Sequence, residues 1–198
     1  MFTIDHIAAE LHRQPVESNP FVAEPSHAAV AMIIRDGVNE LDVCFIRRAE
    51  KQGDPWSGQV AFPGGRAESV DEDAPAVAER ETHEEIGLVL SREQMIGALP
   101  ESVINRSHQP RPLTLSPFVY YVPTLEADLR GNEEVAAIFW VPMSHLFDTG
   151  NITELEWGGS DSLFPGIQFD EHVIWGLTLR VLGTFAERMN HTLPALRS

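Results

Sequence analysis

Three glutamates with the spacing of a metal site, Glu81, Glu84 and Glu85, lie in the stretch GGRAESVDEDAPAVAERETHEEIGL, residues 64–88. On a helix at about 100° per residue they fall within an arc of roughly 100°. Like charges at these spacings repel by a few tenths of a kcal/mol per pair, and the negative end of the helix adds to the cost. Mg²⁺ or Mn²⁺ prefers oxygen ligands, and its positive charge would turn the repulsion between the glutamates into attraction to the ion. The pattern predicts a divalent-metal site, with a solvated acidic helix face as the alternative.

Two neighbouring features support the metal interpretation. Arg80 lies four residues before Glu84 and can hold one carboxylate in position. Upstream, residues 62–65 read Phe-Pro-Gly-Gly, which predicts a turn whose backbone can approach an ion or a phosphate closely.

The same stretch resembles the signature of the Nudix hydrolases, GX5EX7REUXEEXGU, in which U is a bulky aliphatic residue. The REUXEEXGU positions are occupied by Arg80, Glu81, Glu84, Glu85, Gly87 and Leu88. Two departures are visible. Thr82 stands at an aliphatic position, and the spacing from Gly65 to Arg80 is one residue longer than the pattern. The upstream acid is therefore Asp71 when counted forward from Gly65, or Glu72 when counted back from Arg80.

The resemblance implies a fold of the α/β class, a Nudix αβα sandwich with a mixed β-sheet. It also implies hydrolysis of a nucleoside diphosphate linked to another moiety, with Mg²⁺ or Mn²⁺ as the cofactor. The metal ligands that it implies are Glu81, Glu84, Glu85 and the backbone carbonyl of Gly64. A homodimer is common in the family and is the implied assembly.

The resemblance implies a catalytic set of Glu81, Arg80, Glu84 and Glu134. Arg80 would orient a glutamate through a charge-assisted hydrogen bond. Family members differ in the general base, which here is either Glu81 or a glutamate on a later loop. Glu133 and Glu134 are the later candidates, with a plain acidic turn as the alternative.

Two further stretches resemble the coenzyme A diphosphatase branch of the family. One runs from Arg48-Ala49 through Gly58 to the Phe-Pro-Gly-Gly turn, and the other is IWGLTLRVL near the C-terminus. This resemblance implies cleavage of coenzyme A or its derivatives into 3′,5′-ADP and 4′-phosphopantetheine. A second arginine of the branch motif is absent, since Gly53 and Asp54 stand there. ADP-ribose or another nucleotide is thus the alternative substrate, and a non-catalytic Nudix binding module is the third hypothesis.

Substrate contacts are expected from Arg48, Arg66 and Trp56, the last being either a ligand contact or an anchor of its own loop. Other cations available for a phosphate are Lys51, Arg106 and Arg111. Trp175 is expected on the last helix, in the core or against a base, and His83 is expected in solvent.

The pattern of apolar, polar and turn-forming residues along the chain predicts the helices and strands that position these residues. A helix over 73–86 should be capped by Asp71 or Asp73 and stopped by Gly87. Residues 1–26 read as an N-terminal helix and linker, and residues 27–198 as one Nudix domain. The expected strands are 27–34, 40–48, 59–62, 95–99, 113–122, 135–142, 153–157 and 163–169, the first two forming a hairpin. The other expected helices are 3–12, a turn at 143–147 and a closing helix at 173–189.

Composition narrows the class of partner. The 198 residues carry 30 acidic and 14 basic side chains, giving a net charge of −16 and a pI near 4.7. Such a surface repels nucleic acid and anionic membranes, so the expected partner is a small nucleotide conjugate. The longest apolar run, 28–34, is too short to span a membrane. The first residues lack a basic stretch before an apolar one, so we expect no signal peptide and a cytoplasmic protein.

Overall fold

The computed structural model describes residues 2–13, 15–53, 56–105, 111–125, 128–157 and 162–196. The helices are α1 (Ile4–Arg13), α2 (Ala74–Ile86), α3 (Met143–Leu146) and α4 (Gly176–Arg188). The strands are β1 (His27–Asp36), β2 (Leu41–Arg48), β3 (Val60–Ala61), β4 (Gly64–Arg66), β5 (Met95–Ala98), β6 (Ser102–Ile104), β7 (Leu113–Tyr121), β8 (Val135–Pro142), β9 (Ile152–Glu156), β10 (Leu163–Phe169) and β11 (His172–Trp175). Short 3₁₀ turns lie at Arg92–Gln94, Thr149–Asn151 and Pro194–Leu196.

The large sheet is mixed. Its main path runs β3-β2-β1-β7-β5, while β4 pairs with β1, β6 with β7 and β8 with β2. The β1–β7 pair is parallel, and the other pairs are antiparallel. The predicted hairpin forms between β1 and β2, with Ile34 opposite Val43. A second, antiparallel sheet has the order β11-β10-β9.

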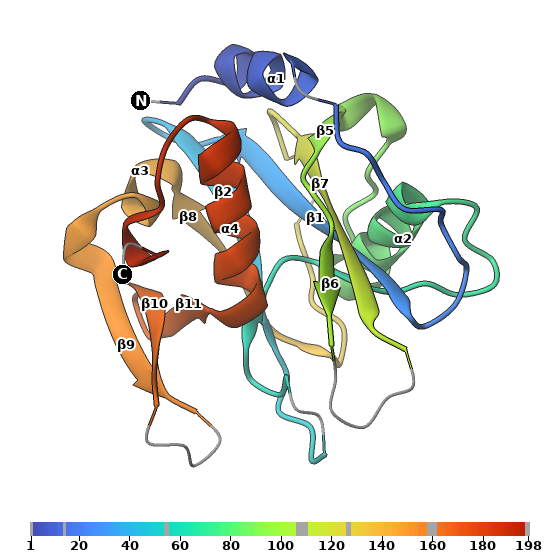
Figure 1. The fold of residues 1–198 in the computed structure, drawn as a ribbon. Coiled ribbons are helices and arrows are strands. Elements are labelled where there is room, and N and C mark those ends of the chain that lie inside the picture. The colour runs from blue at the N-terminus through green and yellow to red at the C-terminus, as the bar shows by residue number, and fades with distance from the viewer. Residues whose placement is uncertain are drawn as a thin grey trace.

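Successive side chains of β1 point to opposite faces of the large sheet, and both faces are buried. Ala29, Ala31 and Ile33 pack with α2, whereas Met32 and Ile34 pack with α1 and α4 on the other face. Figure 1 shows α4 and α2 on opposite sides of this sheet. The predicted αβα arrangement is therefore confirmed.

The predicted start of the closing helix at Val173 is wrong. Residues 173–175 belong to β11, in which Ile174 pairs with Ile167 of β10. Gly176, at φ +63°, is the point where the chain leaves the strand and enters α4. Trp175 consequently caps the helix from the strand side, and its ring centroid lies 4.9 Å from that of Trp157.

The N-terminal helix packs on the large sheet. Ile7 and Leu11 of α1 are buried in the same hydrophobic cluster as α4, and Leu11 lies over Gly97 of β5. The division of the chain at residue 26 stays a prediction. Over the described ranges, no helix combines the length and the apolar character needed to cross a membrane.

Candidate functional site

Helix α2 carries the acidic residues of the site. Asp73 caps its N-terminus by accepting a 2.9 Å hydrogen bond from the Ala76 N–H, and Gly87 ends it at φ +73°. Ala74 and Val77 pack against the sheet, and the same helical face carries Glu81 and Glu85 one and two turns later. The packing of α2 against the sheet therefore directs these two carboxylates toward the interior of the protein.

Glu85 is the most deeply placed of the three glutamates, with 2% of its surface exposed. Its Oε2 accepts a 2.9 Å hydrogen bond from the Gly64 N–H. Burial raises the pKa of Glu85 to about 8 despite this bond, and the neighbouring charge of Glu81 acts in the same direction. A cation beside Glu85 would remove this penalty.

Glu81 lies directly over Gly65. A Cβ on Gly65 would come within 2.3 Å of the Glu81 carboxyl carbon, so a side chain at this position would displace the carboxylate. Burial raises the pKa of Glu81, and the nearby Arg80 guanidinium acts against that rise. The double glycine and the helix thus bring Glu81 and Glu85 to one place.

Arg80 connects the rest of the motif. Its guanidinium donates to Glu81 at 3.0 Å, to Glu84 at 3.1 Å and to the Arg66 carbonyl at 3.0 Å. Two further bonds of 3.0 Å join it to both carboxylate oxygens of Asp71. The bond to Asp71 is the main cause that raises the pKa of Arg80.

The upstream acid of the motif is Asp71 in this structure. Its side chain is 3% exposed, and although burial opposes its ionisation, the Arg80 bonds lower its pKa. Glu72 is exposed. The extra residue between Gly65 and Arg80 therefore lies after the acid rather than before it.

Thr82 fits the buried position that the motif reserves for an aliphatic residue. Its side chain is fully buried, and its hydroxyl donates to the Ala78 carbonyl at 2.6 Å. The polar atom is satisfied within the helix, so this departure leaves the packing of α2 intact.

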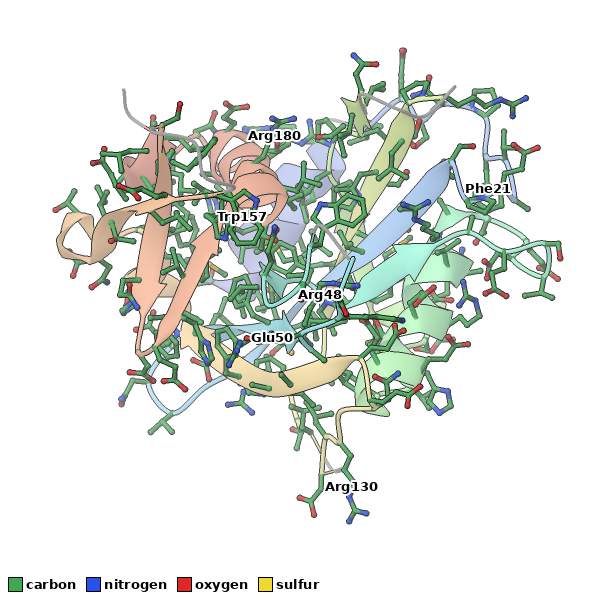
Figure 2. All side chains as sticks on the ribbon, turned by 90° about the horizontal axis from the view of Figure 1, so that it is seen from below. Phe21, Arg48, Glu50, Arg130, Trp157 and Arg180 are labelled. Carbon is green, nitrogen blue, oxygen red and sulfur yellow. The ribbon has the colours of Figure 1, made fainter. Side chains whose placement is uncertain are left out.

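A cavity of about 590 Å³ opens beside Glu81 and Glu85. Its polar lining comes from Arg48, Lys51, Gln52, Trp56, Gln59, Arg66, Glu81, Glu85 and Glu134. Its apolar lining comes from Ala28, Val30, Val60, Ala61, Phe62, Leu113, Leu115, Leu177 and Val181, with Thr178 and three glycines completing the wall. Figure 2 shows Arg48 near the middle of the molecule, and Arg130 on a loop that points away from it.

The structure brings most of the predicted residues to this cavity. Arg48, Arg66 and Trp56 all line it, and the Arg66 guanidinium carbon lies 5.8 Å from the centre of the Trp56 ring. Glu134 also lines it, and the Lys51 Nζ lies 3.7 Å from the Glu134 Oε1.

Other predicted residues lie elsewhere. The Glu84 side chain is 52% exposed at the rim, and His83 is exposed as predicted. Arg111 pairs with Glu24 outside the cavity lining, and Trp175 likewise does not line it. Arg106 lies outside the described residues.

The α4 side of the cavity comes from the stretch IWGLTLRVL, residues 174–182, which the sequence marks by resemblance without indicating which residues line a site. Leu177, Thr178 and Val181 of α4 line the cavity, and the Thr178 hydroxyl donates to the Val60 carbonyl at 2.9 Å. The resemblance marks this stretch, but its residues are of ordinary core types, so the sequence does not indicate which of them line the cavity.

The acidic residues fit a hard cation in chemistry but are not already gathered around one point. Within the described parts of the chain, no three His, Cys, Asp or Glu side chains form a ready metal-binding group. Glu84 accepts a hydrogen bond from Arg80 and is not among the residues that line the cavity, whereas Glu81, Glu85 and Gly64 line it. An all-oxygen set with one buried and one partly buried carboxylate suits Mg²⁺ or Mn²⁺.

The sequence has relatives that share its length. A 28% identical match over 194 residues, 95% of this chain and 94% of the other, is an uncharacterized Nudix hydrolase, NudL, from Yersinia enterocolitica. A 32% identical match over 161 residues is a human protein named mitochondrial coenzyme A diphosphatase NUDT8, covering 79% of this chain and 66% of that protein. The chain thus spans just under two thirds of the human relative.

The fold has a similar solved structure. The crystal structure of a MutT/nudix family protein from Enterococcus faecalis superimposes with a TM-score of 0.59 at 18% identity, over 99% of this chain and 74% of that one. The family model described as the NUDIX domain matches residues 25–160. This stretch contains β1, α2 and every acidic residue of the site, and the chain belongs to the Nudix family.

Proposed function

We propose that this protein hydrolyses the diphosphate bridge of a nucleoside diphosphate linked to another moiety, with coenzyme A or its derivatives as the substrate. The observation that carries the proposal is the pair of carboxylates, buried Glu85 and partly buried Glu81, at a cavity that also receives Arg48 and Arg66. Acidic and basic groups together in one cavity suit an anion that arrives with a cation.

Mg²⁺ or Mn²⁺ would be held by Glu81, Glu85 and the Gly64 carbonyl, with Glu84 as a further ligand. When bound, the ion supplies positive charge that neutralises the diphosphate and activates the attacking water. Arg80 engages only the Oε2 of Glu84, so the other carboxylate oxygen could bind the ion, and Arg80 also keeps its two bonds to Asp71.

The protein groups then orient the substrate and move one proton. Arg80 keeps Glu81 in place, and Arg48 and Arg66 are the cations that would contact phosphate oxygens. Trp56 offers a ring for an adenine base. The proton of the attacking water goes to a glutamate, which is Glu134 or Glu81.

The choice of coenzyme A rests on two supports. The human relative is named a coenzyme A diphosphatase, although the missing second arginine leaves ADP-ribose and other nucleotides as the alternative. The apolar part of the cavity, between β7 and α4, suits the uncharged pantetheine chain better than a second sugar phosphate. We propose the cytoplasm as the compartment and a homodimer as the assembly.

The test is a hydrolysis screen with coenzyme A, acyl-coenzyme A, ADP-ribose, NADH and diadenosine polyphosphates, each with Mg²⁺, Mn²⁺ or EDTA. We expect coenzyme A to yield 3′,5′-ADP and 4′-phosphopantetheine, and chelator to abolish turnover. A kcat/KM far higher for ADP-ribose would select the alternative substrate. Tight binding without turnover would indicate a binding module, and undiminished activity in EDTA would refute the metal site.

A further inference from the structure

The chain contains one lysine, Lys51, against thirteen arginines, and this lysine lines the cavity. Its Nζ lies 3.7 Å from the Glu134 Oε1. The Lys51 side chain is 74% exposed and that of Glu134 is 50% exposed. Solvent screens such a pair strongly, so the contact is weak and a more highly charged anion can replace Glu134.

The backbones of both residues are fixed although their side chains are exposed. The Ala49 N–H donates to the Glu134 carbonyl at 2.8 Å, and the Lys51 N–H donates to the Ser57 hydroxyl at 2.8 Å. A change of partner at the Lys51 amine therefore requires rotation of side chains only.

Hydrogen bonds through Asn132 also connect the backbone of Glu134 to the C-terminal end of α2. The Asn132 N–H donates to the Glu85 carbonyl at 2.9 Å, and the Asn132 side-chain oxygen accepts from the Glu134 N–H at 2.8 Å. Glu134 and Glu85 both line the cavity, and the charge of Glu134 contributes to the raised pKa of Glu85. Lys51 thus contacts a glutamate that lines the cavity in which the diphosphate would be cleaved.

We propose, on the basis of the proposed function, that the Lys51 amine exchanges Glu134 for the substrate diphosphate. In the free protein Lys51 holds the Glu134 carboxylate. In the complex Lys51 contacts the diphosphate, and Glu134 becomes available as the base. The water oxygen then bonds to phosphorus, the bridging P–O bond breaks with its electron pair on the departing phosphate, and the water proton goes to Glu134.

The exchange predicts a specific pattern in a double-mutant cycle. Lys51→Met should raise KM for coenzyme A by about tenfold, the loss expected for one charge-assisted hydrogen bond, and leave kcat within about twofold. Glu134→Gln should lower kcat by about 100-fold, as for loss of a general base. It should also lower KM by up to about fivefold, since the substrate no longer displaces a carboxylate from Lys51.

The effect of Glu134→Gln on KM should disappear when residue 51 is Met, because the two changes act on one contact. Lys51→Arg should restore a KM near that of the wild type. Arg130→Met, which removes an exposed cation from the loop before Glu134, is the matched control and should change neither constant. Coenzyme A and 3′-dephospho-coenzyme A should respond equally, because both carry the diphosphate.

Several outcomes would overturn the exchange. One is a fall in kcat at unchanged KM for Lys51→Met, which would mean that Lys51 positions Glu134 throughout turnover. The exchange would also be overturned if the effects of the two substitutions on KM were additive. It would likewise be overturned if Lys51→Met changed KM for coenzyme A but not for 3′-dephospho-coenzyme A. The same cycle should be measured as Kd for coenzyme A by calorimetry with Mg²⁺. If the protein hydrolyses coenzyme A but the effects of the two substitutions on KM are additive, the exchange is rejected and the proposed hydrolysis stands. If the effects on Kd are coupled but coenzyme A is not hydrolysed, the proposed hydrolysis is rejected and the exchange stands.

Discussion

Replacing Glu85 by Gln should make the metal-free protein more stable while it removes activity. The side chain keeps its size, and its amide oxygen can still accept the Gly64 N–H. The change removes a carboxyl group whose pKa is about 8 in the fold and 4.5 without the protein environment. Turnover should fall by orders of magnitude, because one of the charges that would hold the metal is lost.

The size of the stability gain follows from the pKa shift. The folded state holds the Glu85 proton up to about pH 8 and the unfolded state releases it above 4.5, so metal-free stability falls as pH rises through this window. At about 1.36 kcal/mol per pH unit, the penalty is below about 1 kcal/mol at pH 5 and about 3 kcal/mol at pH 7. Relaxation around the site reduces these values, so we expect a gain of about 1–3 kcal/mol at pH 7.

The assay is urea unfolding at pH 5, 7 and 8 in EDTA, repeated with Mg²⁺. The variant should be more stable than the wild type in EDTA at pH 7, nearly equal at pH 5, and less responsive to Mg²⁺. Glu84→Gln is the matched control on the same helix: its exposed carboxylate predicts lost activity without a pH-dependent gain. If Glu85→Gln gives no gain at pH 7 in EDTA, the argument from burial is wrong.

Two further substitutions test the geometry around the glutamates. Gly65→Ala should leave the free energy of unfolding within about 1 kcal/mol, because the added Cβ meets only the movable end of Glu81, yet the displaced carboxylate should reduce kcat by about 100-fold; wild-type activity would show that Glu81 acts from another position. Asp71→Asn should destabilise the protein by about 2–4 kcal/mol in urea unfolding, since it leaves the partly buried Arg80 without its main partner, whereas Glu72→Gln should have no measurable effect. Equal effects of the two would mean that the upstream acid is misassigned.

The local parts of the site could be predicted from the sequence, because their signals are local. Asp73 and Gly87 bound α2 as expected, and helical spacing alone put Glu81 and Glu85 at the edge of the packed face. The choice between Asp71 and Glu72 could not be made, because it depends on the path of the loop that precedes the helix. That path is fixed by the contact with Arg80, which spacing does not reveal.

The errors near the C-terminus have a different physical cause. The run Val173–Trp175 is compatible with either a strand or a helix, and pairing with β10 decides in favour of the strand. The wall formed by α4 depends on how the end of the chain packs across the sheet from α2. Such long-range contacts leave no pattern in a single sequence.

One part of the cavity wall, formed by α4, lies apart from the acidic residues along the chain. The family model ends at residue 160, whereas Leu177, Thr178 and Val181 lie beyond it and still line the cavity together with Glu81 and Glu85. Substitutions at these positions can reshape the room available to the substrate tail without touching the acidic helix or the double glycine. A laboratory library confined to this short stretch would therefore change the shape of the cavity while Glu81, Glu85 and the double glycine stay constant.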